Sequence, residues 1–207
     1  MGHFFDFEGP FFSFIEKAAD IVILNIVFII CCLPVITIGA SLTALSSVTQ
    51  KIVRKEEGYI IKGFFVSFKR NFIQATLIWI IMLIFAGIFW IDIRILSKAD
   101  SNGINAVFTG LLMLLGIIYI FELIYVFPVL AKFDNTVINT MRNALILSVS
   151  RLPWTLVLLL LLTVPPVIGY FYIWAAIPIY IFAGFSLTSC LSSAIFAKIF
   201  EPLITDG

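Results

Sequence analysis

LPWTLVLLLLLTVPPVIGYFYIWAAIPIYIFAGFSLTSCLSSAIFA, residues 152–197, is a run of 46 residues without a formally charged side chain. A helix needs about 20 consecutive apolar residues to cross a bilayer, so this run is long enough for two helices. Helix-interrupting residues stand in its middle, at Pro165, Pro166, Gly169 and Pro178. We therefore predict two spanning helices, one near residues 152–171 and one near residues 178–197.

The composition of the whole chain points the same way. Of the 207 residues, 62% are apolar and 12% are charged, whereas soluble domains are usually about 45–50% apolar and about 25% charged. A chain of this length cannot bury that much apolar surface in one core, so a lipid bilayer must cover it. These values exclude a soluble enzyme, a disordered chain and, with a net charge of +1, a nucleic-acid binder.

Three further apolar segments precede this run, at residues 21–45, 72–91 and 104–130. The sequence thus predicts an all-α membrane protein, a polytopic helical bundle of about five transmembrane helices within residues 21–200. A tail of residues 1–20 precedes the bundle, and a short tail of residues 201–207 follows it.

The distribution of lysine and arginine predicts the orientation of the chain. Under the five-span topology, 10 basic residues lie on one side of the membrane and 3 on the other. Because cytoplasmic loops carry the excess of Lys and Arg, we expect the side with 10 to be cytoplasmic. The N-terminus is then outside and the C-terminus is inside.

Two loop segments have apolar residues at helical spacing with basic residues between them, residues 59–72 and residues 135–152. Basic amphipathic helices lie in the headgroup plane, so we expect two cytoplasmic surface helices, the second capped at its start by Asp134 or Asn135. They are either membrane-bound connectors or a docking face for a partner protein. The basic residues of such a docking face are Arg54, Lys62, Lys69, Arg70, Arg142 and Arg151.

One carboxylate, Glu122, lies deep in a predicted span. A charge at this depth is costly, so its side chain should face the bundle interior and find a polar partner there. The polar residues expected at similar depth are Thr37, Ser41, Gln74, Thr76, Ser189 and Ser192. The site is either a proton or substrate site or a hydrogen bond that fixes helix packing, and the sequence leaves both open.

Small residues concentrate in the first and last spans, and these allow either close helix packing or a polar cavity lining. They are Gly39, Thr43 and Ser47 in the first span, and Ser186, Ser189, Cys190 and Ser193 in the last. Hydrolase, nucleotide-binding and metalloprotease motifs are absent from the sequence. We therefore expect no enzymatic activity, no catalytic residue, no metal and no cofactor.

Six motifs occur along the chain: LPVITIGASLTAL (33–45), KIVRKEEGYI (51–60), FFVSFKRNFIQAT (64–76), YVFPVLAKFDNTVINTMRNAL (125–145), SRLPWTL (150–156) and AKIFE (197–201). In these motifs the sequence resembles the YesL-like family of bacterial membrane proteins, a domain-of-unknown-function family. The resemblance implies a bacterial, mostly Gram-positive, inner-membrane protein encoded beside carbohydrate ABC transporters, sugar-responsive two-component systems and glycoside hydrolases. It supplies no established binding residues.

Two functions follow as expectations. The first is a non-enzymatic accessory or regulatory partner of a carbohydrate ABC transporter or a sugar-sensing system. The second is a small transporter or channel, working alone or as a homo-oligomer, with a polar site around Glu122.

Overall fold

The computed structural model describes residues 10–56, 58–98 and 103–205, and every regular element within them is helical. The elements are α1 (Pro10–Cys32), η1 (Val35–Thr37), α2 (Ile38–Val53), α3 (Ile60–Leu96), α4 (Gly103–Lys132), α5 (Val137–Ser150), α6 (Leu152–Phe171), α7 (Ile173–Ile179), η2 (Tyr180–Gly184) and α8 (Phe185–Thr205). Residues 1–9 of the expected tail and residues 206–207 lie outside the described residues.

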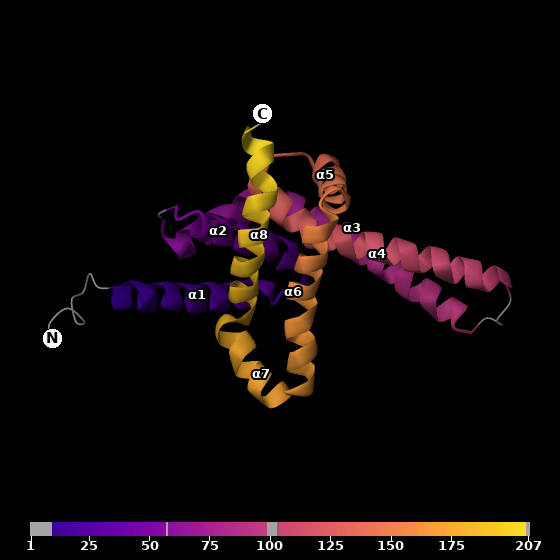
Figure 1. Cartoon of the computed structure of the whole chain (residues 1–207), viewed down its shortest axis with the longest axis horizontal. Helices are drawn as coiled ribbons and strands as arrows, with labels where there is room; N and C mark the ends of the chain where they lie inside the picture. Colours follow the sequence, from indigo (N-terminus) through magenta and orange to yellow (C-terminus); the bar gives the residue numbers. More distant parts are fainter. Residues whose placement is uncertain (1–9, 57, 99–102, 206–207) are drawn as a thin grey trace.

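The expected first span, residues 21–45, is not one helix. Helix α1 ends at Cys32, the chain turns through Pro34 and the short η1, and α2 runs back alongside α1 (Figure 1). Proline has no N–H group and disfavours a helical conformation in the residue before it. Thr37 stabilises the turn, since its hydroxyl donates to the carbonyl oxygens of Cys31 at 2.6 Å and Pro34 at 2.7 Å.

Helix α2 is the centre of the fold, although it is only 16 residues long. Its buried residues are mostly small or hydroxylated, and they include Gly39, Ala40, Ser41, Thr43, Ala44, Ser47 and Thr49. At Gly39 a Cβ atom would lie 2.5 Å from the Ala75 carbonyl oxygen and 2.7 Å from Trp79 Cβ of α3. Small residues thus let α2 approach its neighbours closely, as is usual between membrane helices.

Helices α3 and α4 form a long hairpin. The expected surface helix at residues 59–72 is not separate, because α3 runs without a break from Ile60 to Leu96. No proline occurs in that range. At about 1.5 Å per residue, α3 is about 55 Å long and exceeds the bilayer core of about 30 Å. We call residues 83–96 and 105–119, the far part of this hairpin, the arm.

The second amphipathic segment does form its own helix, α5. Its N-cap is Thr136, whose hydroxyl accepts from the Asn139 backbone N–H; the expected caps, Asp134 and Asn135, lie before it. Helix α5 ends before Arg151, which has non-helical backbone angles, and Pro153 stands in the first turn of α6. Pro153 explains why α5 ends before the span α6 begins, whereas residues 59–72 continue into the span as part of α3.

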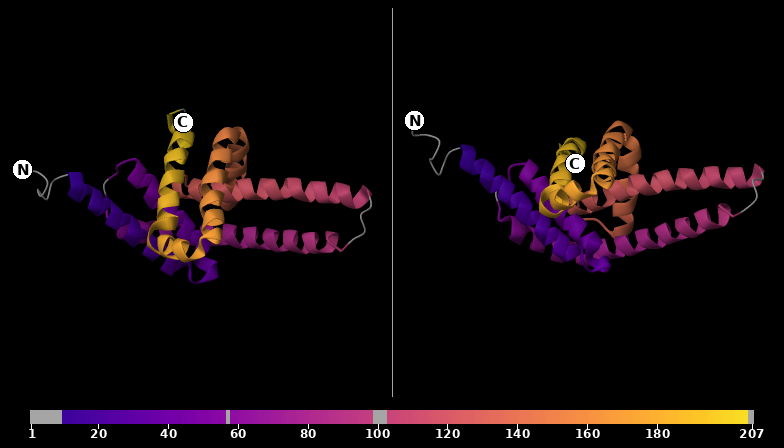
Figure 2. Two further views of the ribbon diagram at one scale, coloured as in Figure 1. Left: turned by 60° about the horizontal axis from the view of Figure 1, so that its bottom comes forward. Right: turned by 90° about the horizontal axis from the view of Figure 1, so that it is seen from below.

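Helices α6 and α8 form a second hairpin, with α7 and the π-helical turn η2 at its closed end. This hairpin and the arm leave the molecule in different directions (Figure 2). Four helical segments are long and apolar enough to cross a membrane, Ile60–Leu96, Asn105–Lys132, Leu152–Phe171 and Ala176–Glu201. Helix α1 is not among them, since charged residues occupy positions 16, 17 and 20.

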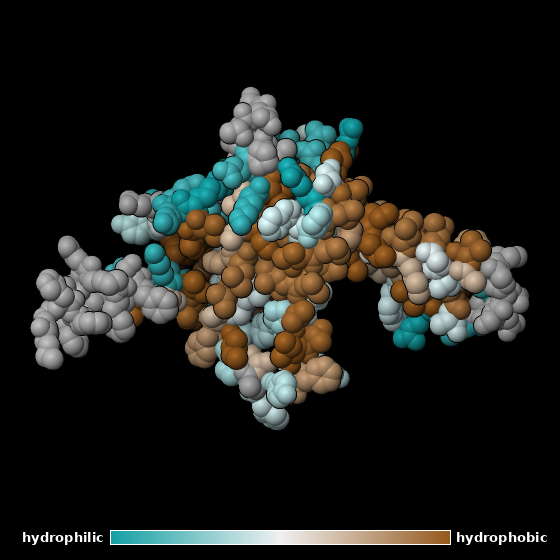
Figure 3. All heavy atoms as spheres, viewed as in Figure 1, coloured by the Kyte–Doolittle hydropathy of each residue, from teal (hydrophilic) through white to brown (hydrophobic). Residues whose placement is uncertain are grey.

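Apolar side chains cover the length of both hairpins, with more polar residues at their far ends, and most hydrophilic residues gather at one end of the molecule, near the ends of α2 and α8 and around α5 (Figure 3). The arm and the α6–α8 hairpin have most of their large apolar side chains exposed. This distribution is typical of a membrane protein, since only lipid or another membrane protein can cover such surfaces.

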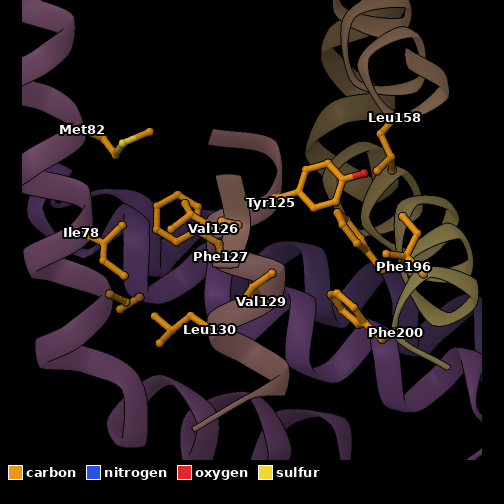
Figure 4. Packing of buried hydrophobic residues seen from close by; sticks show 14 residues of the cluster. Ile78, Met82, Tyr125, Val126, Phe127, Val129, Leu130, Leu158, Phe196 and Phe200 are labelled. Atoms are coloured by element: carbon orange, nitrogen blue, oxygen red, sulfur yellow. The ribbon is translucent and has the colours of Figure 1, made fainter. Parts of the chain in front are cut away.

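The main apolar core lies where α4 crosses α3, α6 and α8. Tyr125 and Phe196 meet edge to face with ring centroids 5.2 Å apart. On the opposite side of α4, Val126 and Phe127 face Ile78 and Met82 of α3 (Figure 4). The core therefore joins the bases of the two hairpins.

Candidate functional site

Glu122 lies half-buried on α4, one turn before the core. Within the described part of the chain, its carboxylate has no hydrogen bond and no ion pair, and none of its six expected partners bonds to it. The structure therefore does not assemble a polar site around Glu122.

The six expected partners lie in three separate places. Thr37 and Ser41 are at the α1–α2 turn, where the Ser41 hydroxyl donates to the Thr37 carbonyl oxygen at 3.0 Å. Gln74 and Thr76 lie on α3, and Thr76 Oγ1 is buried without a hydrogen-bond partner among the described residues. Ser189 and Ser192 lie on α8, against α2.

A hydroxyl cluster joins α2 to α8. Thr49 Oγ1 lies 3.0 Å from Ser189 Oγ and 2.8 Å from Ser193 Oγ, and it also donates to the Leu45 carbonyl oxygen at 2.9 Å. Thr49 is fully buried. These small side chains bond to one another, which favours the close-packing interpretation of the small residues at this contact over a polar lining.

A second polar contact ties α1 to the π-helical turn. The Asn25 amide donates to the carbonyl oxygens of Tyr180 at 2.9 Å and Ile181 at 2.7 Å, and its Oδ1 accepts from the Ser186 N–H at 2.9 Å. Asn25 is fully buried. A π-turn leaves backbone groups without their usual helical partners, and one asparagine bonds to three groups here.

Gln50 connects α4, at Pro128, to the basic end of α2. Its amide Nε2 donates to the Pro128 carbonyl oxygen at 3.2 Å, and its Oε1 accepts from Arg54 Nη2 at 3.4 Å. Gln50 is 3% exposed. The side chain of Arg54 is thus positioned from within the core, and Arg54 also pairs with Glu56 at 3.2 Å.

Arg54 stands at a polar cavity of about 230 Å³ at the hydrophilic end. We call this cavity the basic pocket; its lining includes Ser47, Gln50, Lys51, Arg54, Glu56, Gly63, Val66, Ser67, Arg70, Ala131 and Lys132. Three helices thus bring four cationic side chains together around one carboxylate. Among the described residues, Lys51 and Lys132 form no ion pair, and Arg70 reaches Asp134 only at 3.8 Å between exposed groups.

The six basic residues of the expected docking face do not form one surface. Arg54 and Arg70 converge on the basic pocket. Lys62 and Lys69 are exposed on α3, whereas Arg142 is exposed on α5 and Arg151 lies between α5 and α6. Of the six, Arg54 and Arg70 therefore line the basic pocket. Lys51 and Lys132, which were not among the six, line it with them.

An apolar cavity of about 440 Å³ lies between α2, α4, α6 and α8. Its few polar groups are hydroxyls, among them Ser46, Thr163, Thr188, Ser189 and Ser192. Glu122 does not line it. In the described ranges, no three His, Cys, Asp or Glu side chains lie close enough together to hold a metal ion.

Two of the residues that organise these contacts carry a signal that the sequence analysis missed. Asn25 is the one amide in the apolar run of α1, and Gln50 closes the small-residue run of α2. A buried amide is costly unless it is bonded, so each should have predicted a long-range contact. The basic pocket has no such local signal, since its cations lie up to 81 positions apart, from Lys51 to Lys132.

Residues 21–93, about a third of the chain, match a family described as a protein of unknown function, DUF624. The match covers about half of α1, all of α2 and most of α3, and therefore includes most of the basic pocket. No curated protein matches the chain. No solved structure matches it either.

Proposed function

We propose that the protein is a non-enzymatic accessory or regulatory subunit of a bacterial carbohydrate ABC transporter or sugar-sensing system in the cell membrane. The proposal rests on the sequence resemblance to the YesL-like family and on one feature of the structure, the exposed arm. The family that matches residues 21–93 has no assigned function, so it carries no argument for or against an activity.

The arm supports an accessory role because little of it packs on the rest of the chain. Its large apolar side chains are exposed, with Ile84 at 58%, Val107 at 74% and Met113 at 67%. Between its two helices lies an apolar cleft of about 770 Å³. The cleft includes the small residues Ala86 and Gly116, at which a helix of a transporter or sensor subunit can approach closely.

A transporter or channel working alone is the second candidate. The apolar cavity between α2, α4, α6 and α8, with hydroxyls on its wall, is the observation that favours it. Against it, Glu122 lies outside that cavity, and the Thr49 cluster uses its hydroxyls in contacts between helices. The accessory role therefore requires fewer assumptions.

We also propose a cytoplasmic position for both ends of the chain, in place of the outside N-terminus that five spans imply. Helix α2 returns toward the side from which α1 enters, and four spans then follow. This arrangement adds Lys17 to the basic cytoplasmic side, in accord with the positive-inside rule, and places α5 at that surface.

An N-terminal tag should be digested by protease in inside-out vesicles and protected in right-side-out vesicles; the reverse pattern would refute this orientation.

Photo-crosslinking tests the accessory role directly. A photoreactive amino acid at Met113 of the arm should crosslink in native membranes to a transporter or sensor subunit, identified by mass spectrometry. The matched control is Ile168, which is 54% exposed on the other hairpin and should give no such product. Adducts with lipid alone, or the same product from both positions, would contradict docking through the arm.

A further inference from the structure

We propose that the basic pocket binds the phosphate group of an acidic phospholipid, with the acyl chains lying along α3. This inference concerns a ligand rather than a partner protein, and it does not depend on the proposed accessory role. Four cations converge on one polar cavity at the hydrophilic end of the molecule.

The pocket offers the donors that a phosphate requires. Arginine binds phosphate oxygens through two parallel N–H groups, and lysine binds them as a compact charge. Arg54 and Arg70 face the cavity from α2 and α3, and Lys132 faces it from the end of α4. Ser67 adds a hydroxyl whose oxygen already accepts from Asn71 Nδ2 at 3.3 Å, which leaves its hydrogen for a ligand.

The cations exceed what the fold itself needs. Helices α2 and α4 both end at the pocket, and a helix C-terminus carries about half a negative charge. Two such ends offset about one of the four cations, and Glu56 offsets another through Arg54. The contact between Arg70 and Asp134 is long and exposed, so it stabilises little. Glu201 and Lys198 of α8 lie beside Arg54 and Lys132 and add one charge of each sign, so a positive excess remains for an anion.

The location of Arg70 favours a lipid over a soluble phosphate. On α3, Arg70 follows Val66 and precedes Ile73 and Leu77, at spacings that put all four near one face of the helix. Val66 is 58% exposed, Ile73 74% and Leu77 48%. The cationic pocket thus opens at the head of an apolar stripe, as a headgroup site with adjacent acyl chains requires, and basic pockets between membrane helices bind such headgroups.

Native mass spectrometry of the purified full-length protein tests the site with defined probes. With phosphatidylglycerol added in a neutral detergent, the protein should retain lipid, and phosphatidylcholine should bind far less. The double variant R54Q/K132Q should lower retention of phosphatidylglycerol by about tenfold or more, since two charge-assisted contacts are lost. R70Q, at an exposed position that does not endanger folding, should also lower it severalfold.

The matched control is K55Q/R142Q, which removes two charges from exposed positions outside the pocket. Its retention should stay within about twofold of wild type, since its charges interact with the lipid only across screened solvent. Equal losses in K55Q/R142Q and R54Q/K132Q, or wild-type retention in R54Q/K132Q and R70Q, would overturn the pocket. If glycerol phosphate displaces phosphatidylglycerol at equal concentration, the pocket binds a soluble phosphate ester, and the proposal of a lipid ligand is wrong. No displacement would support the lipid.

Discussion

Helix α2 is buried over most of its 16 residues, whereas the arm exposes most of its large apolar side chains. The buried helix is the one rich in alanine, serine and threonine, and the exposed helices are rich in isoleucine, leucine and phenylalanine. This reverses the pattern of a soluble protein. In lipid, apolar surface gives no drive for association, and small and polar residues hold helices together. Burial around α2 therefore depends on specific contacts, and the arm remains available to a partner.

Loss of the contact between Asn25 and the π-helical turn should lower the stability of the protein more than any other change considered below. Asn25→Leu keeps the side-chain volume but leaves three backbone groups without their partner, and each buried unbonded group costs about 1–3 kcal/mol. We expect a loss of about 2 kcal/mol or more in thermal unfolding in detergent, followed by tryptophan fluorescence. Thr109→Val, which removes one bond within an arm helix, should change little. Equal effects would refute the difference between the two regions.

Alanine substitutions at two glycines compare the packing around α2 with the packing in the arm. Gly39→Ala places a methyl group against the α3 backbone, and overpacking of this kind costs about 1–3 kcal/mol. Gly87→Ala in the arm meets no atom within 4 Å and should stabilise α3 by up to about 1 kcal/mol, because alanine favours helix more than glycine. Opposite signs in the two melting temperatures are expected; a neutral Gly39→Ala would mean that α2 and α3 are not in close contact.

The hydroxyl cluster between α2 and α8 should contribute less. Thr49→Val removes two contacts between helices, and such bonds average about 0.6 kcal/mol each in membrane proteins, so we expect a loss of about 1 kcal/mol. Thr163→Val is the control, since Thr163 donates only to the Leu159 carbonyl oxygen of its own helix. Unfolding in a graded series of denaturing detergent distinguishes the two variants, and a larger loss in the control would contradict this role.

The smallest effect is expected at the base of the arm. Tyr119 there donates from its hydroxyl to the Met82 carbonyl oxygen at 3.1 Å. Tyr119→Phe should therefore cost less than about 1 kcal/mol in the same unfolding measurement. A loss greater than that of Asn25→Leu would show that the arm, like α2, depends on polar contacts.

The sequence predicts the α6–α8 hairpin well because its apolar run is long enough for two spans, although its prolines lie inside α6 and α7 and the turn falls at Tyr172. It predicts the two amphipathic segments less well, since residues 59–72 and residues 135–152 share one pattern, and only Pro153 separates the second from its span. Residues 21–45 mislead because they form one apolar run long enough to span, although the chain turns back at Pro34. The basic pocket needs the tertiary fold, which no local pattern contains.

The return of the chain at Pro34 makes α2 the core of the fold and leaves the arm outside. Cysteines introduced at Lys17 and Lys55, one at a time, mark the two open ends of the α1–α2 hairpin; the background would have Cys31, Cys32 and Cys190 replaced by alanine. Both positions are exposed. A membrane-impermeant maleimide should label both from the cytoplasmic side, in inside-out vesicles. Labelling of the two positions from opposite sides would mean that residues 21–45 cross the membrane as one span, and would contradict a return of the chain at Pro34.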